Sequence, residues 1–242
     1  LGEIGIRVQE EMMKELGLGV PEITWHTARD NLAEFVCVLG ILTSTVGKIA
    51  NEIVNLQKTE FSEVEEPFVM GKVGSSTMPQ KRNPMISENV ISLSKIIRSA
   101  APLAIEAMIG EHERDMRGWQ TEWEFIPRTC LMCDALLKSA IYIIKDLIVY
   151  PENIESNMFK LKGLMLSEAV MLKLAATIGR QEAHEIVYQT CMAAFEKGVP
   201  LKDALLSDQK IAKEFDVEIL DNILDPHNYT GLAGEFVDRV VG

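Results

Sequence analysis

Residues 27–57 form the longest uninterrupted helical pattern in this sequence of 242 residues. The segment contains no proline, and large apolar residues recur along it at steps of three and four, the spacing of one helix face. These residues are Leu32, Phe35, Leu39, Leu42, Val46, Ile49, Ile53 and Leu56. A helix of this length would extend about 45 Å at 1.5 Å per residue. Because such helices usually pack in bundles, often between subunits, the segment predicts an all-α, long-helix bundle.

The rest of the first 150 residues also has a helical period. We expect an amphipathic helix within residues 1–19 and two further long helices, over about 84–108 and 118–150. Prolines inside these helices predict bends at Pro102 and Pro127. No run of alternating apolar and polar residues indicates a strand.

Shorter helices are expected after Pro151. They cover about 153–162, 166–178 and 181–197 and are followed by three smaller ones, with glycines at the expected caps. We therefore predict two domains: a long-helix bundle over 1–150, which contains the loop 71–84, and a small helical C-terminal domain over 151–242.

The charge balance argues against nucleic acid as a partner. Lys and Arg total 24 and Asp and Glu total 36, a net charge of −12, and the sequence has no basic cluster. Charged residues interrupt the apolar runs before about 18 residues, so we expect no membrane helix. The first residues do not read as a secretory signal, and the four cysteines form no disulfide framework, which favours a cytoplasmic protein with reduced thiols.

Cofactor and metal motifs are weak in this sequence. Cys130 and Cys133 form a CxxC within an apolar helical stretch, where two core thiols are favoured over a redox or zinc site. The histidines are scattered without metal-ligand spacing.

Segment 74–84, which reads GSSTMPQKRNP, differs from everything around it. Physically it is a glycine-hinged, hydroxyl-rich loop that delivers Lys81 and Asn83 to the start of a helix. A helix amino end beside an ammonium and an amide donor can bind a carboxylate. The alternative interpretation of this composition is a polar loop between helices.

This segment resembles the signature Gly-Ser-Ser-x-Met-Pro-x-Lys-x-Asn-Pro of the fumarase/aspartase superfamily at every fixed position. Further segments resemble the branch of adenylosuccinate lyase and carboxymuconate cycloisomerase. They are WHTARD at 25–30, HERD at 112–115, PEN at 151–153 and DP at 225–226. The resemblance extends along the chain, which looks like the C-terminal portion of a subunit roughly twice as long.

The resemblance implies an enzyme that cleaves a Cα–N or Cα–O bond of a small polycarboxylate by β-elimination and typically releases fumarate. Ser75 corresponds to the family's base, which gives an aci-carboxylate intermediate. Lys81 and Asn83 match the substrate-carboxylate ligands, and Glu88 matches the glutamate that orients a partner histidine. The other positions that match substrate-binding residues are Ser76, Thr77, Met78 and Arg114. No organic cofactor or metal is implied, because protein donors stabilise the carbanion.

The resemblance also implies a particular assembly. Family members are homotetramers in which each active site is built from several subunits, and the partner histidine lies in segments that precede Trp25. We therefore expect a homotetramer with shared sites, and a chain that is incomplete as a catalyst by itself.

Two tryptophans bear on the branch. Adenylosuccinate lyases hold a nucleotide phosphate with a serine and an arginine at the positions of Trp119 and Trp123, and indoles cannot replace them. The pattern instead resembles 3-carboxy-cis,cis-muconate cycloisomerase and its relatives, among them lyases of N-substituted succinates. One packed helix face is the other interpretation of the two indoles. Gln80 stands where both subfamilies usually have histidine, so the substrate stays open.

Two alternatives to a lyase follow from the same resemblance. One is a lactonising 3-carboxy-cis,cis-muconate cycloisomerase. The other is a non-catalytic structural member, as in the lens crystallins, although a purely structural protein would not need Ser75, Lys81, Asn83 and Glu88.

Overall fold

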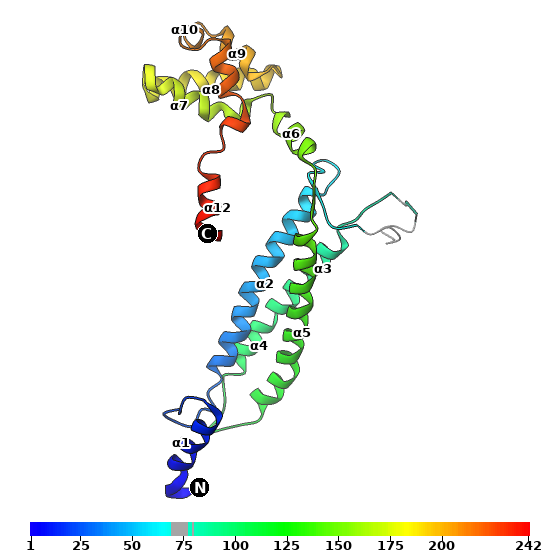
Figure 1. Cartoon of the computed structure of the whole chain (residues 1–242), viewed down its shortest axis with the longest axis vertical. Coiled ribbons are helices and arrows are strands. Elements are labelled where there is room, and N and C mark those ends of the chain that lie inside the picture. Colours follow the sequence, from blue (N-terminus) through cyan, green and yellow to red (C-terminus); the bar gives the residue numbers. More distant parts are fainter. Residues whose placement is uncertain (69–76, 79) are drawn as a thin grey trace. The chain divides into compact units, whose positions relative to one another are not determined.

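The computed structural model describes residues 1–68, 77–78 and 80–242. Its regular structure there is helical apart from one short pair of strands (Figure 1), which confirms the all-α class. The chain divides into two units, Leu1–Val149 (unit 1) and Tyr150–Gly242 (unit 2).

Unit 1 is built around a bundle of long helices. A 3-10 turn, Gly2–Ile4, leads into α1 (Gly5–Leu16), and the bundle itself consists of α2 (Asp30–Leu56), α3 (Met85–Arg98), α4 (Ala100–Glu106) and α5 (Arg117–Lys145). Helices α2, α3 and α5 pack against one another along their length (Figure 1). The predicted helix over 27–57 is therefore present, with its start shifted by three residues.

The face of α2 that packs inside this unit carries mostly small residues, and of the predicted large apolar stripe only Ile53 is buried. Its buried positions are Ala33, Val36, Gly40, Thr43, Gly47, Ala50 and Ile53. A Cβ on Gly47 would lie 2.5 Å from Ser94 Oγ, so glycine permits the close approach of α2 and α3. Phe35, Leu42 and Ile49 are each 43% exposed. Several large residues of the stripe are therefore exposed. The small residues face the other helices because they let the helix backbones pack more closely.

A bend was predicted at Pro102, but the helix is interrupted three residues earlier, at Ser99. The helix over 84–108 is divided at Ser99, between α3 and α4. Proline has no N–H to donate to the carbonyl four residues earlier, so Pro102 fits best in a first helical turn. Dividing the helix at Ser99 puts Pro102 in the first turn of α4.

A short antiparallel pair, β1 (Val64–Glu65) and β2 (Ile148–Val149), was not expected from the sequence. Val64 pairs with Val149 and Glu65 with Ile148. Each strand has two residues, which is too short for an alternating pattern to be seen. The pair ends α5 at Lys145, before the predicted limit at residue 150.

Helix α2 is long and apolar enough to cross a membrane by length and composition, with an 18-residue window of mean hydropathy 1.6. Charge does interrupt its apolar run before about 18 residues, as predicted, because the stretch between Glu34 and Lys48 has 13 residues. A core helix of a bundle meets the same criterion, and 28% of this window is buried inside the structure.

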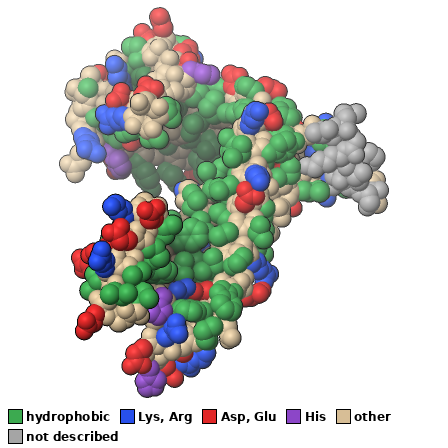
Figure 2. Space-filling model, turned by 60° about the horizontal axis from the view of Figure 1, so that its bottom comes forward, with side chains coloured by type: hydrophobic (Ala, Val, Ile, Leu, Met, Phe, Trp, Pro, Cys, Tyr) green, Lys and Arg blue, Asp and Glu red, His purple; other side chains and the backbone are tan. Residues whose placement is uncertain are grey.

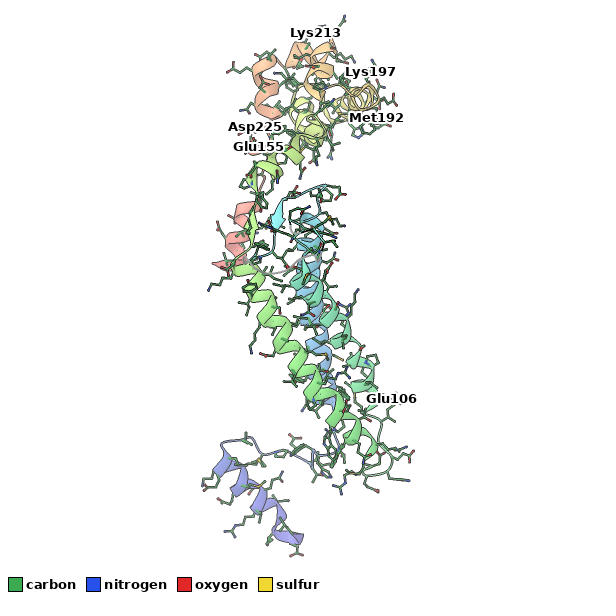
Figure 3. The ribbon with its side chains drawn as sticks, turned by 90° about the vertical axis from the view of Figure 1, so that its right-hand side faces the viewer. Glu106, Glu155, Met192, Lys197, Lys213 and Asp225 are labelled. Carbon is green, nitrogen blue, oxygen red and sulfur yellow. The ribbon has the colours of Figure 1, made fainter. Side chains whose placement is uncertain are left out.

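Unit 2 consists of shorter helices around an aliphatic core. They are α6 (Pro151–Phe159), α7 (Ser167–Ile178), α8 (Arg180–Lys197), α9 (Leu201–Ser207), α10 (Ile211–Glu214), α11 (Val217–Ile223) and α12 (Ala233–Val241), with 3-10 turns at Leu164–Leu166 and Pro226–Asn228. Gly198 ends α8 with a φ of 65°, as its predicted cap position requires. Asp225, labelled in Figure 3, accepts a hydrogen bond from the His227 N–H at 3.0 Å.

Candidate active site

The described end of the signature segment lies directly before α3. Thr77 and Met78 are exposed, and the Lys81 N–H donates to the Met78 carbonyl at 3.0 Å, which closes a turn. The Lys81 side chain is exposed, and Asn83 is half-buried with its carbonyl accepting from the Met85 N–H at 2.8 Å. The turn therefore presents the ammonium and the amide next to each other along the chain.

Glu88 lies in the first turn of α3 and is exposed. The structure thus brings Glu88, Lys81 and Asn83 to the same end of the bundle. The predicted base Ser75 and its neighbour Ser76 lie outside the described residues.

The amino end of α3 is occupied by a carboxylate of the chain itself. Glu66, which is 3% exposed, accepts hydrogen bonds from the N–H groups of Ile86 at 3.1 Å and Ser87 at 3.0 Å, and from Ser87 Oγ at 3.2 Å. The expectation that this helix start receives a substrate carboxylate is wrong for these two amides. A buried carboxylate needs such donors, and the helix dipole favours it at an amino end.

A second set of contacts joins the two ends of the segment that contains the signature. Gln57 Oε1 accepts from the Glu66 N–H at 3.0 Å, and Gln57 Nε2 donates to the Arg82 carbonyl at 3.3 Å. The Arg82 guanidinium donates to Glu65 Oε1 at 2.9 Å and lies 4.1 Å from the Phe68 ring centroid. The backbone at Glu66, before the signature, and at Arg82, within it, is therefore held at the carboxyl end of α2.

Arg114 lies elsewhere in the unit, where it lines a pocket together with Ala107, the residue after α4. Glu106, the last residue of α4, is labelled in Figure 3. Loop 110–116 and the residues before α2 line this pocket, which has a volume of about 190 Å³. The guanidinium carbons of Arg29 and Arg114 lie 5.7 and 5.5 Å from the ring centroid of Trp119, within cation–π range. One indole thus contacts two cationic side chains beside the pocket.

The two arginines differ in how their charge is balanced. Arg29 Nε donates to Glu122 Oε1 at 2.8 Å, and its Nη2 pairs with the other carboxylate oxygen; the Glu122 side chain is 5% exposed. Arg114 forms no ion pair with a carboxylate in the described part of the chain. Arg114 is therefore the side chain that can offer its positive charge to an anionic ligand in the pocket.

Asp115 holds the loop that carries Arg114. Its carboxylate accepts from the Arg117 guanidinium at 2.8 Å and from the N–H groups of Glu111 at 2.7 Å and Arg117 at 2.9 Å. These bonds, with that from the guanidinium the strongest, hold the pKa of Asp115 well below its ordinary value. His112 has a φ of 54°, in the left-handed region, so the loop adopts a tight and unusual backbone conformation.

The residues around Lys81 and the pocket that contains Arg114 lie at opposite ends of α2. Arg29 directly precedes this helix, and Gln57, which contacts Arg82, directly follows it. Twenty-seven helical residues at 1.5 Å each extend about 40 Å. Lys81 and Arg114 of one chain are therefore too far apart to contact the same small substrate.

The interpretation of Trp119 and Trp123 as one packed face does not hold within this chain. Trp119 is half-buried beside the pocket, whereas Trp123 is 65% exposed. The same helix, α5, thus presents the two indoles to different surroundings.

Sequence reasoning missed Glu66, Gln57 and Glu122. No local signal marked Glu66 as a cap of α3, because it lies 19 residues before Met85, the first residue of that helix. The roles of Gln57 and Glu122 depend on partners far away in sequence.

Metal ligands do not gather in the described part of the chain: no group of three or more His, Cys, Asp or Glu side chains there could hold an ion. All four cysteines are free thiols. Cys133 is buried, and burial raises the pKa of its thiol, whereas Cys130 is exposed.

Comparison with known families agrees with the signature. A family profile described as Lyase matches residues 3–98, and one described as Adenylosuccinate lyase C-terminus matches residues 163–240. The chain belongs to the fumarase/aspartase superfamily. The matches confirm the resemblance found at the signature and along the chain.

This chain is similar to enzymes that carry different names. It is 40% identical to N-acetyl-S-(2-succino)cysteine lyase of Dickeya dadantii, over 99% of this chain and 53% of that protein. It is 38% identical to 3-carboxy-cis,cis-muconate cycloisomerase of Pseudomonas aeruginosa, over 100% of this chain and 52% of that protein. The crystal structure of a fumarate lyase from Mesorhizobium sp. BNC1 matches with a TM-score of 0.89 and 37% identity, over 99% of this chain and 53% of that one. The chain thus spans about half the length of the curated relatives it matches.

Proposed function

We propose that the protein is a lyase that removes a substituent from a substituted succinate by β-elimination and releases fumarate. The observation that carries this proposal is the grouping of Lys81, Asn83 and Glu88 at the start of α3, in a chain of the fumarase/aspartase superfamily. A cationic and an amide donor beside each other suit a carboxylate whose charge grows in the transition state.

The roles proposed for the residues are those that the resemblance to the superfamily implies. Ser75 acts as the base that removes the proton next to the substrate carboxylate. A serine hydroxyl can do so only where water is excluded and its oxyanion is stabilised by nearby donors. Lys81 and Asn83 stabilise the aci-carboxylate, and Glu88 orients the partner histidine. Ser76, Thr77 and Met78 complete the substrate contacts on the same segment.

The leaving atom is sulfur or nitrogen in this proposal. The relative from Dickeya dadantii is named for a substrate in which a succinyl group is attached to cysteine sulfur. A thiol leaves more readily than an alcohol because its pKa, about 8.5, is much lower. We therefore infer that the substrate is a small polycarboxylate of the S- or N-substituted succinate type.

Each active site is shared between copies of the chain, which form a homotetramer in the cytoplasm. The distance of about 40 Å along α2 between the Lys81 and Arg114 ends supports this, since one substrate cannot contact both in the same chain. Figure 2 shows hydrophobic side chains gathered along the bundle, and Leu131 and Ile141 of α5 are 73% and 65% exposed. Large apolar side chains that are exposed and lie together on one surface are typical of a protein–protein contact. Arg114 of one copy then binds a second anionic group of the substrate.

A second candidate is the lactonising 3-carboxy-cis,cis-muconate cycloisomerase. It is favoured by the 38% identity to the Pseudomonas aeruginosa enzyme and by Trp119, which lines the pocket beside Arg114. The flat face of the Trp119 indole suits stacking against a planar conjugated carboxylate.

The test is an assay of the intact protein that contains this chain. Purified protein is given S-substituted succinates, N-substituted succinates and 3-carboxy-cis,cis-muconate, and fumarate or lactone is measured. We expect fumarate from a substituted succinate, with loss of activity in Ser75→Ala and full activity in the control Ser99→Ala. Lactone without fumarate would select the cycloisomerase. Absence of any turnover would favour a non-catalytic structural member.

A further inference from the structure

Glu66 is a buried carboxylate that the elimination chemistry does not use. Its side chain lies against the first turn of α3, with its oxygens within 3.2 Å of two backbone N–H groups and one hydroxyl. Burying an ionised carboxylate is costly unless donors replace its water, and here the donors belong to Ile86 and Ser87. The contact therefore fixes the start of α3 relative to β1.

Gln57 also holds the backbone near the start of α3. Its amide oxygen accepts from the Glu66 N–H, and its amide nitrogen donates to the Arg82 carbonyl. One side chain thus joins Glu66, which precedes the signature, to Arg82, which lies within it sixteen positions later. The Arg82–Glu65 ion pair at 2.9 Å adds a third connection, between the backbone segment that contains Glu65 and Glu66 and the segment that contains Arg82.

These contacts lie beside the residues of the proposed chemistry. Lys81 and Asn83 are the neighbours of Arg82, and Glu88 follows Ser87. A shift of about 1 Å in such groups can lower a rate about a hundredfold. The positions of the three groups therefore depend on the contacts of Glu66 and Gln57.

We propose that Glu66 is a positioning residue, which with Gln57 sets the alignment of Lys81, Asn83 and Glu88 for charge stabilisation in the transition state. This inference rests on the proposed lyase function. Because the aligned groups stabilise charge that develops during reaction, misalignment lowers kcat more than it raises KM.

The first variant is Glu66→Gln in the intact protein, with Glu52→Gln as the matched control. Glu52 is an exposed carboxylate on α2, near Gln57 in sequence. Glutamine keeps the size of Glu66 but turns one acceptor oxygen into a donor facing N–H groups. We expect kcat to fall about 10- to 100-fold with a change in KM of less than about threefold, and no change in the control.

A double-variant cycle separates positioning from general loss of stability. If Glu66 acts through Lys81, then Lys81→Gln costs much less activity in the Glu66→Gln protein than in the wild type. Full additivity of the two losses, or an unchanged kcat in Glu66→Gln, would overturn the proposal. If Glu66→Gln does not fold by circular dichroism, Gln57→Ala replaces it in the same cycle, and additivity there overturns the proposal equally.

Hydrogen exchange gives a readout that does not depend on activity. The N–H groups of Ile86 and Ser87 should exchange several-fold faster in Glu66→Gln than in the wild type and at an unchanged rate in Glu52→Gln. Equal exchange in all three proteins would overturn the proposal by showing that the contact is not made. A wild type that is inactive on every substrate would instead refute the proposed function, and the positioning role with it, even if exchange changes as expected.

Discussion

Unit 2 has an almost wholly aliphatic interior, whereas unit 1 buries several polar and charged side chains beside aliphatic ones such as Ile97, Leu136 and Ile143. Fully buried residues of unit 2 include Leu174, Leu201, Leu205, Ile211 and Leu220. In the described part of unit 1 the buried polar and charged residues are Thr43, Glu65, Glu66, Ser87, Ser94, Glu122 and Thr129. Unit 1 at the same time leaves large apolar residues exposed on α2 and α5.

This difference has a physical meaning. An aliphatic core gains free energy from burial wherever the volume is filled, so unit 2 can be stable through its own packing. Buried polar groups contribute little net stability, but they are satisfied in one arrangement only. Unit 1 therefore uses its interior to fix geometry around Lys81 and Arg29, and its exposed apolar faces remain available for contact with other chains.

The largest effect is expected in the core of unit 2. Leu205 is fully buried, so Leu205→Ala should lower the free energy of unfolding by about 3 kcal/mol, through lost transfer energy and the cavity left behind. Urea denaturation followed by circular dichroism measures it. A loss below about 1 kcal/mol would contradict the description of unit 2 as a closed aliphatic core.

The next effect concerns the buried ion pair of unit 1. Glu122→Gln should cost about 2 kcal/mol, because it leaves the Arg29 guanidinium, with 15% of its side chain exposed, without a carboxylate. Asp134→Asn is the matched control on the same helix, since its pair with Lys138 is exposed and should be worth about 0.5 kcal/mol or less. Equal losses in the two variants would show that burial of the Arg29 pair has no energetic consequence.

A smaller effect is expected on the exposed face of α5. Leu131→Ala should change the free energy of unfolding by less than about 0.5 kcal/mol in dissociated chains. It should weaken self-association about tenfold, which corresponds to about 1.4 kcal/mol. Sedimentation over a dilution series measures the association. If dilution separates the variant and the wild type at the same concentration, this face does not contact another copy.

The smallest effect concerns the loop around Arg114. Hydrogen bonds from Arg117 and from two backbone N–H groups lower the pKa of Asp115 in the folded state. The carboxylate therefore stabilises the fold above the ordinary carboxyl pKa of 3.8, and this stability is lost as the pH falls through the folded pKa. Asp115→Asn should be less stable than the wild type at pH 6, and the difference in unfolding midpoint should shrink below pH 4. A constant difference across this range would contradict the role of the charge.

Much of the fold could be predicted from the sequence because helix periodicity is a local property. The uninterrupted segment 27–57 predicted α2 closely, and the caps and breaks after Pro151 predicted α7 and α8. The side of α2 that packs within the chain could not be predicted from hydrophobicity, since the small residues of that face became buried through the close approach of α3.

The same distinction between local and long-range information applies to the candidate site. The sequence by itself determined the superfamily and which residue types are candidates for its chemistry, because the signature is a contiguous segment whose spacing carries the information. Only the tertiary structure decided that Glu66 occupies the amino end of α3, that Gln57 joins Glu66 to Arg82 of the signature, and that Arg114 lies at the opposite end of α2 from Lys81. These relations join residues far apart in the chain, and hydrogen bonds between such residues exist only once the helices have packed.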